Sequence, residues 1–390
     1  MTKLVRLGDV VDYIRGITFK PDDLVETNAP AAVVCMRTKN IQTELDESDR
    51  IAVPPAFVKR SEQYLIEGDV LISSANSWNL VGKVVAVPKL RYPATAGGFI
   101  SIVRAKKSYL DARYLFNWLQ TDSVQSQIRN CGRQTTNISN LSSQLFLELK
   151  IPLHPLAEQH RIATILDMAD SLRRKRQEAI RLADDFLRAA FYEMFGDPVA
   201  NNRRWPERAI DEIAKVTTGN TPSREVDAYF GNAIEWIKSD NINTPSHWLT
   251  RAREGLSKLG LTVARTAPTG STLMTCIAGS PSCIGNVAMT DRTVSFNQQI
   301  NAVTPISGVQ SEFVYALLLF SKGRIQATST NSMKGMVSKG ALEKVHLIWP
   351  PSDLQEKFVK LFRQVHQVRT RMVNADVSQL SNALQSKLLA

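Results

Sequence analysis

The sequence predicts an α+β protein in which two mixed α/β domains are separated by a long antiparallel two-helix coiled coil, with a pseudo-twofold internal repeat. Three observations support this fold class: matching segments in the two halves, short β-branched segments in each half, and two long segments with coiled-coil spacing. The predicted segments are a first domain (1–152), a first long helix (153–196), a second domain (197–352) and a second long helix (353–390) that pairs with the first.

The internal repeat consists of matching segments that occur in the same order in both halves, at an offset of about two hundred residues. The matching pairs are 37–41 with 238–242, 68–84 with 270–287, 114–119 with 313–318, and 151–155 with 347–351. A glutamine follows the last pair at the same spacing in each half, as Gln159 and Gln355. One such match would mean little, but four in one order indicate a duplication.

The two domains combine strand and helix signals. Residues 70–72, 83–87 and 99–103 are short, β-branched and bounded by Gly or Pro, which is typical of strands. Residues 111–128 have helical spacing, and Gly97-Gly98 is typical of a turn. We therefore expect each domain to be a mixed α/β unit.

The other two segments predict long helices with one apolar stripe. No Gly or Pro interrupts 156–195, and Gly196 supplies the stop. At about 1.5 Å per residue, each helix would extend roughly 50–60 Å. The apolar stripe of such a helix must be shielded from water, and we expect the two helices to bury their stripes against each other. The spacer and partner-contact positions of this seam are Ile162, Ile165, Ala169, Leu172, Phe186, Phe358, Leu361, Val365, Val368 and Met372.

Charge and composition favour a polyanionic partner. The chain carries 48 Lys and Arg against 37 Asp and Glu, a net charge of +11, and 43% of its residues are hydrophobic. The two predicted domains each carry an excess of four positive charges. We see no secretory signal and no run long enough to span a bilayer, so we expect a cytoplasmic protein without membrane association. The four cysteines form no CxxC pair, so we expect reduced thiols and no metal site.

Catalytic signatures are missing from the sequence. It contains no GxxxxGK[ST], GxGxxG or HExxH motif, and it lacks the [ND]PP[YF] tetrapeptide of amino-methyltransferases. We therefore expect a binding protein without catalytic residues. Two alternatives stay open: a self-sufficient methyltransferase or nuclease that modifies DNA through unrecognised motifs, and a helical scaffold that binds only proteins.

The order of the four segments resembles the specificity subunit of type I restriction–modification systems, the HsdS family. The residues that carry this resemblance are 150–159 and 195–198, at the two ends of the first long helix, together with 236–242 and 270–285 in the second domain. The second helix departs from the family pattern, because Gln355 precedes Glu356 where Glu then Gln is usual.

The resemblance implies a role for each segment. The domains would be target-recognition domains that each read one half of a bipartite sequence in double-stranded DNA, and the helices would fix the gap and dock two modification (methyltransferase) subunits. S-adenosylmethionine, ATP and Mg²⁺ would belong to the modification subunits and to the restriction/translocase subunits of the assembled complex. This chain would then need no cofactor of its own.

Candidate DNA contacts are polar side chains in predicted loops and at strand ends. Arg and Lys suit guanine, whereas Asn and Gln suit adenine. Asn40 and Asn241 recur in both halves, which favours a structural role or a phosphate contact, because two domains that read different sequences need different base contacts. The candidates are Arg37, Lys39, Asn40, Asn76, Trp78, Arg133, Gln134, Thr135, Asn137, Lys238, Asn241, Ser280, Asn297, Gln298, Asn331 and Lys334.

Overall fold

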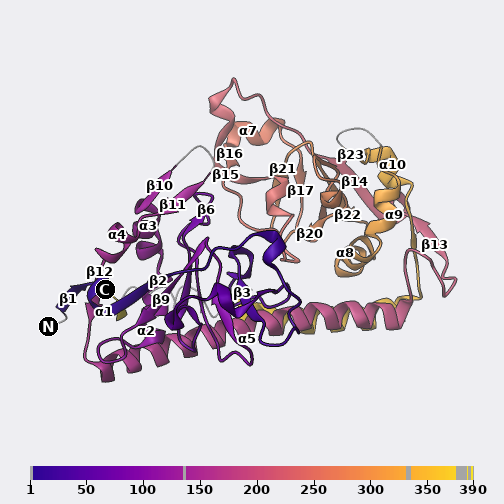
Figure 1. Cartoon of the computed structure of the whole chain (residues 1–390). Coiled ribbons are helices and arrows are strands. Elements are labelled where there is room, and N and C mark those ends of the chain that lie inside the picture. Colours follow the sequence, from indigo (N-terminus) through magenta and orange to yellow (C-terminus); the bar gives the residue numbers. More distant parts are fainter. Residues whose placement is uncertain (1–2, 135–137, 331–334, 375–383, 385–387, 390) are drawn as a thin grey trace. The chain divides into compact units, whose positions relative to one another are not determined.

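The computed structural model describes residues 3–134, 138–330, 335–374, 384, 388 and 389 (Figure 1). Contacts divide the chain into two compact units: unit 1 is Met1–Gln177 with Ala375–Ala390, and unit 2 is Glu178–Asn374. The division falls inside helix α5 (Leu156–Phe195), which contributes residues to both units. The predicted α+β class is confirmed, whereas the division into four segments stays a prediction.

The central sheet of unit 1 is antiparallel, with strand order β2-β9-β5-β7. Because successive side chains of a strand point to opposite faces, Val70 and Ile72 pack with helix α2, whereas Leu71 packs with strands β3 and β8. The sheet is therefore buried on both faces. The elements are β2 (Val11–Arg15), β9 (Ile100–Ala105), β5 (Val70–Ser73), β7 (Val84–Ala86), α2 (Ala112–Leu119), β3 (Val33–Met36) and β8 (Ala94–Ala96).

The other elements of unit 1 are short and surround this sheet. Three smaller sheets have the strand orders β4-β3-β8, β1-β12 and β10-β11-β6. The strands are β1 (Lys3–Arg6), β4 (Ile51–Val53), β6 (Ala75–Asn76), β10 (Gly132–Gln134), β11 (Ser139–Leu141) and β12 (Lys150–Leu153). The helices are α1 (Leu7–Val10), α3 (Asp122–Asn130) and α4 (Ser143–Leu147), with 3-10 turns η1 (Pro21–Asp23), η2 (Thr38–Asn40), η3 (Pro55–Phe57) and η4 (Ser61–Gln63).

Unit 2 repeats this plan, with a central antiparallel sheet of order β14-β22-β18-β20. Its other sheets have the orders β16-β15-β21-β17, β13-β24 and β19-β23. The strands are β13 (Glu207–Ala209), β14 (Ala214–Thr218), β15 (Phe230–Ile237), β16 (Gly255–Leu256), β17 (Thr266–Ala267), β18 (Thr272–Thr275), β19 (Ile277–Ala278), β20 (Val287–Met289), β21 (Val294–Phe296), β22 (Ile300–Pro305), β23 (Gly335–Met336) and β24 (His346–Ile348).

The helices of unit 2 cover this sheet and extend from it. Helix α8 is apolar nearly all round, and seven of its ten residues are buried in the core of the unit. The helices are α6 (Ile210–Ile213), α7 (Lys258–Val263), α8 (Ser311–Phe320), α9 (Lys322–Ala327), α10 (Lys339–Glu343) and α11 (Ser352–Asn374), with 3-10 turns η5 (Asp227–Tyr229), η6 (Ser239–Asn241) and η7 (Pro281–Cys283).

Strand register confirms the predicted repeat residue by residue. Val103 of β9 lies opposite Tyr13 and Val70, and Val303 of β22 lies opposite Val216 and Thr272. Each position of the first central sheet therefore has a counterpart in the second. The turns that lead into the central strands also repeat, because Gly68 and Gly270 both have a positive φ, of 91° and 84°.

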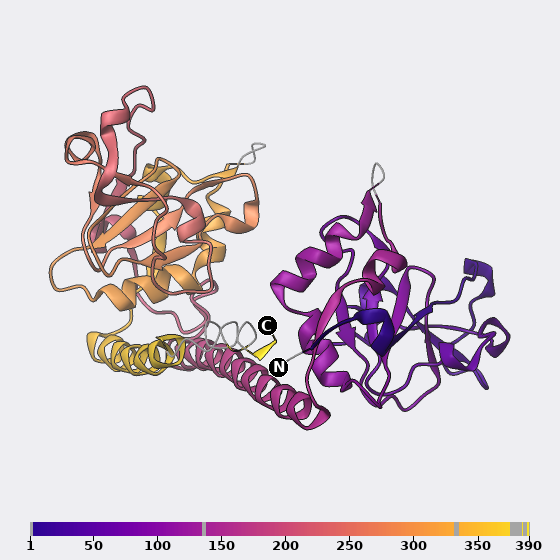
Figure 2. The ribbon, with the colours of Figure 1, turned by 90° about the vertical axis from the view of Figure 1, so that its left-hand side faces the viewer.

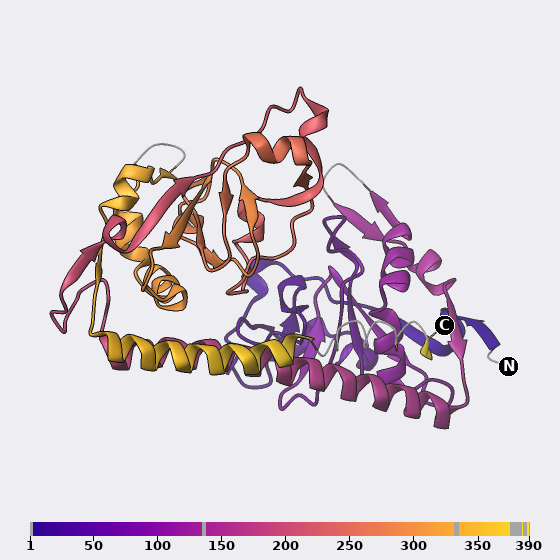
Figure 3. The same cartoon turned by 180° about the vertical axis from the view of Figure 1, so that it is seen from behind.

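Within unit 2, α11 packs beside the second half of α5, as Figures 2 and 3 show for the two neighbouring long helices. The Phe191 ring lies 5.3 Å from the Phe358 ring, and Asp184 lies 3.2 Å from Arg369. Since residue numbers fall along α5 as they rise along α11, the two helices are antiparallel, as predicted. No helix in the described ranges combines the length and the apolar character that a bilayer crossing requires.

The predicted seam is only partly correct. Phe358, Ile162 and Ala169 are buried and Leu361, Val365, Met372 and Ile165 are half-buried, but Leu172, Phe186 and Val368 are 54%, 54% and 47% exposed. The buried face instead includes Leu166 and Phe191 of α5 and Phe362 of α11, which pack into the cores of the two units. A straight helix drifts against a seven-residue repeat, so the buried face turns toward the α/β cores and leaves those three residues outside.

Candidate nucleic-acid interface

Asn40 and Asn241 occupy the same place in the two units, at the end of η2 and of η6. Both amides are buried, with 1% and 6% exposure. The Asn40 oxygen accepts the N–H of Arg37 at 2.7 Å, and the Asn241 oxygen accepts the N–H of Lys238 at 3.0 Å. Each Nδ2 donates to carbonyls farther along the same loop. The structure therefore assigns both amides to the loop framework, which corrects their selection as candidate DNA contacts.

The cations beside these two loops are half-exposed and paired with carboxylates. Arg37 lies 2.8 Å from Asp49, which also contacts Lys39. Lys238 lies 2.6 Å from Glu254 and 5.1 Å from the centre of the Trp236 ring. Ion pairs at the surface contribute little to stability, so a phosphate group can compete for these cations at small cost.

The sheet β10-β11-β6 brings further predicted contacts of unit 1 together. Arg133 lies opposite Asn140, and Asn76 lies opposite Ser139 in strand register. Trp78 is 38% exposed and lies close to Gly132 of β10. Thr135 and Asn137, which join β10 to β11, lie outside the described residues, as do the side chains of Arg133 and Gln134.

The other predicted contacts of unit 2 that the structure describes lie after strands β19 and β21. Asn297 is 8% exposed, and its Oδ1 accepts the N–H of Gln299 at 3.1 Å. Gln298 is exposed and accepts a hydrogen bond from Thr221, and Ser280 lies 2.8 Å from Ser282 through their hydroxyls. The predicted contacts Asn331 and Lys334, which precede β23, lie outside the described residues.

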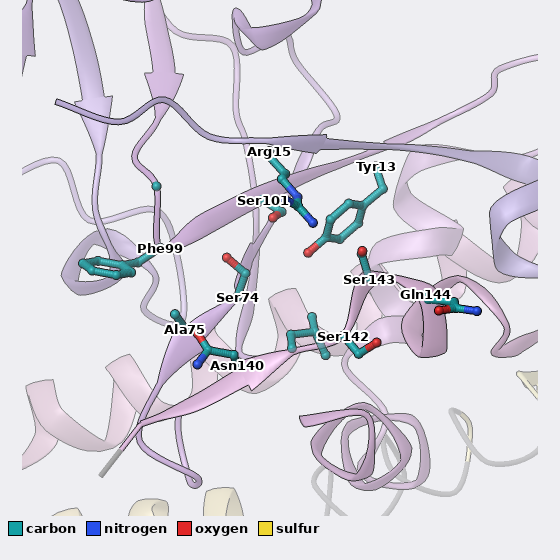
Figure 4. Close-up of a pocket in the computed structure, with 12 residues that line it drawn as sticks. Tyr13, Arg15, Ser74, Ala75, Phe99, Ser101, Asn140, Ser142, Ser143 and Gln144 are labelled. Atoms are coloured by element: carbon teal, nitrogen blue, oxygen red, sulfur yellow. The ribbon is translucent and has the colours of Figure 1, made fainter. Parts of the chain in front are cut away.

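The structure adds a polar pocket in unit 1 that the sequence did not predict (Figure 4). Its volume is about 530 Å³, and its walls come from β2, the 97–99 turn, β9, β6, and the junction of β11 with α4. Tyr13 and Ser101 lie on one wall, where burial raises the pKa of Tyr13. Phe99 stands at the rim with 66% exposure. The only sequence signal for this pocket was the glycine pair 97–98 before an aromatic residue.

The side chains at these sites are of the kinds that form hydrogen bonds and stacking contacts with nucleic acid. In the described part of the chain, no group of three or more His, Cys, Asp or Glu side chains is arranged to hold a metal ion. The ordered groups are amides, hydroxyls, guanidinium groups and aromatic rings at the strand ends. These groups can donate to phosphates and read base edges.

A carboxylate anchors the loop that follows η6. Glu235 accepts hydrogen bonds from Arg292 at 2.7 and 2.9 Å, from Arg251 at 2.9 Å and from the Ala252 N–H at 2.9 Å. The Arg292 hydrogen bonds are the largest cause that lowers the pKa of Glu235 to about 2. Because the Glu235 carboxylate is 21% exposed, these interactions are partly shielded from solvent.

This carboxylate gives unit 2 an expected pH dependence. A carboxyl group whose pKa is lower in the folded state stabilises the fold above its unfolded pKa, about 4.5, and loses that contribution as pH falls toward the folded value. We expect the free energy of unfolding of unit 2 to fall from pH 5 toward pH 2, and Glu235→Gln to flatten this dependence. Denaturant titrations followed by tryptophan fluorescence measure it. Glu193→Gln, at an exposed position of α5, is the matched control and should keep the wild-type slope.

Comparison with known proteins places this architecture in one family. A family model described as the type I restriction modification DNA specificity domain matches residues 2–182 and 202–380. Because these two matches cover most of the sequence, the chain belongs to this family.

Two curated relatives carry the same description. The chain is 27% identical over 188 residues to the type I restriction enzyme StySPI specificity subunit of Salmonella potsdam, which covers 47% of this chain and 40% of that protein. It is 24% identical over 202 residues to the HindI specificity subunit of Haemophilus influenzae, which covers 48% and 41%. Each match thus spans about two fifths of the relative's length.

A solved structure shares the fold. The S subunit of the type I restriction–modification system from M. genitalium superimposes with a TM-score of 0.65 and 14% sequence identity, covering 100% of this chain and 96% of that chain. At this identity the likeness establishes the fold, which confirms the predicted arrangement of two α/β domains and long helices.

Proposed function

We propose that this chain is the DNA sequence-recognition subunit of a type I restriction–modification complex and carries no catalytic residue of its own. Unit 1 and unit 2 would each read one half of a bipartite target, with a gap set by α5 and α11. The observation that carries this proposal is one α/β frame present twice, with matching sheet register and different polar side chains at equivalent strand ends. Family membership supports it.

Charge supports binding to the DNA backbone. Each predicted domain has a net excess of four positive charges. Neutralised phosphates release counterions, so affinity would fall steeply as salt rises. Base contacts from amides and guanidinium groups would then add the sequence preference.

The exposed apolar residues of the long helices support docking of modification subunits. Met168 and Leu172 are spaced four residues apart on α5, as are Leu182 and Phe186, and each is more than half exposed. Val368 of α11 adds a fifth exposed apolar side chain. Apolar stripes of this kind are buried at protein interfaces. Two methyltransferase subunits with S-adenosylmethionine, and restriction/translocase subunits with ATP and Mg²⁺, would complete the complex in the cytoplasm.

Selection from random DNA tests the proposal. The full chain, at low salt, is incubated with a library of random-sequence duplexes, and the bound DNA is sequenced. We expect two short conserved blocks separated by a gap of constant length, and binding that weakens steeply between 50 and 200 mM salt, by about tenfold or more. Enrichment of no sequence would contradict the proposal.

A catalytic assay distinguishes the proposed recognition subunit from the alternative, a self-sufficient DNA-modifying enzyme. The purified chain is incubated alone with DNA and labelled S-adenosylmethionine, and in parallel with DNA and Mg²⁺. We expect neither methyl transfer nor cleavage, since the proposed catalytic groups belong to other subunits. Robust turnover by the purified chain would make it an enzyme.

A further inference from the structure

The pocket of Figure 4 gathers side chains from segments far apart in the sequence. Arg15 comes from β2, Phe99 from the turn before β9, and Asn140 from β11. All three side chains are exposed. Within the described residues, neither the Arg15 guanidinium nor the Asn140 amide makes a hydrogen bond, so both offer their polar groups to a ligand.

The frame beneath this pocket is the same in both units. Gly16 donates to the carbonyl of Ile100, and Gly219 donates to the carbonyl of Ile300, with N–O distances of 3.1 and 3.0 Å. A Cβ on either glycine would lie 2.2 Å from a carbonyl oxygen, so both positions require glycine. The frame therefore fixes the backbone of the two sites in the same way.

The serine that caps the next helix is also shared. Ser142 accepts the N–H of Leu145 at the start of α4, and Ser338 accepts the N–H of Ala341 at the start of α10. Such a capping hydrogen bond satisfies a backbone N–H group that the helix itself leaves without a partner. A residue with this structural task is expected to persist in both copies.

The side chains that surround the pocket, in contrast to these glycines and serines, differ between the two units. Strand register pairs Arg15 with Thr218 and Asn140 with Met336, and shared backbone hydrogen bonds pair Phe99 with Gln299. Each pair changes chemical class: a cation becomes a hydroxyl, an aromatic ring becomes an amide, and an amide becomes a thioether. The shared frame thus carries a different set of recognition groups in each unit.

From this contrast we infer that the pocket is the site at which unit 1 selects bases of its half-site, and that Arg15, Phe99 and Asn140 determine the preference. The inference rests on the proposed function and assigns base selection in unit 1 to particular residues. Two readers of different sequences must differ where they touch bases and agree where they hold the fold.

The chemistry of the three side chains fits the edges of base pairs in duplex DNA. A guanidinium group can donate two hydrogen bonds to guanine, and a carboxamide can pair with adenine through one donor and one acceptor. The exposed ring of Phe99 supplies an apolar surface for a thymine methyl group. In unit 2 the equivalent residue of Phe99 is Gln299, an amide, and the equivalent residue of Asn140 is Met336, which is apolar. The half-site that unit 2 prefers would therefore differ.

Exchanging the pocket residues for those of unit 2 tests the inference. Full-length Asn140→Met and Phe99→Gln variants undergo the same selection from random duplexes as the wild type. We expect the preferred base to change at one or two positions of one block, with at least a tenfold loss of enrichment for the original base. The second block and the gap should stay unchanged.

The controls separate this inference from the proposed function. Arg91→Ala, at an exposed position of unit 1 outside the pocket, should enrich the wild-type sequences. If the wild type enriches two blocks and both pocket variants enrich the same two, the inference is wrong while the proposed function stands. If the wild type enriches no sequence, the proposed function itself fails. Equal melting temperatures for the variants and the wild type confirm that the folds are intact.

Discussion

Insertion of four residues at both boundaries between the units is expected to lengthen the gap in the selected DNA sequence and to leave both conserved blocks unchanged. The boundaries lie between Gln177 and Glu178 in α5 and after Asn374 at the end of α11. Four residues add about one helical turn, or 6 Å. Since base pairs are spaced about 3.4 Å apart, the gap should grow by at most about two base pairs.

The position of the insertions makes this experiment specific. Neither insertion changes a residue inside the core of a unit, so each half-site preference should persist. A four-residue insertion after Gly308 is the control, because that turn is open and a Cβ there meets nothing within 4 Å. The control should select the wild-type gap. An unchanged gap in the double insertion would show that the helices do not set the spacing.

Truncation of Phe191 is expected to cause a large loss of stability in unit 2. Its ring is fully buried and contacts the rings of Phe195, Phe320 and Phe358 at 5.0, 4.6 and 5.3 Å. Phe191→Ala would remove these contacts and leave a cavity, which typically costs about 3–5 kcal/mol. The free energy of unfolding of unit 2, measured in urea, should fall by this amount.

Phe186→Ala provides the matched control on the same helix. Phe186 is 54% exposed, so its removal should change the free energy of unfolding by less than about 0.5 kcal/mol. An equal loss for both variants would contradict the position of the buried face of α5. A variant of Phe186 that is stable but binds modification subunits weakly would support the docking proposal.

Features that depend on local pattern could be predicted from the sequence. The absence of Gly and Pro from 156–195 predicts a helix, and α5 spans Leu156–Phe195. The repeat was predicted because short matching segments carry the same turns and strands in both halves. The phase of the helix seam was predicted less well, because the α/β cores compete with the other helix for the apolar stripe.

The candidate site could be predicted only where one loop forms it. The sequence points to the loop of Asn40 but does not reveal the role of its side chain, which hydrogen-bonds within the loop. An asparagine that is buried cannot be told from an exposed one by its sequence position alone. The sequence does not predict the pocket of Arg15, Phe99 and Asn140, because these three residues lie more than 40 positions apart from one another in the chain. Only strand pairing brings these side chains together.

The last residues of the chain have a consequence for the order of folding. Leu389 is 5% exposed, and together with Leu384 and Leu388 it packs against the core of unit 1, which begins near Leu7. A ribosome makes the N-terminus first, and domains generally fold as they emerge. Here all of unit 2 is synthesised before the final segment of unit 1, so the unit that is started first is completed after the other.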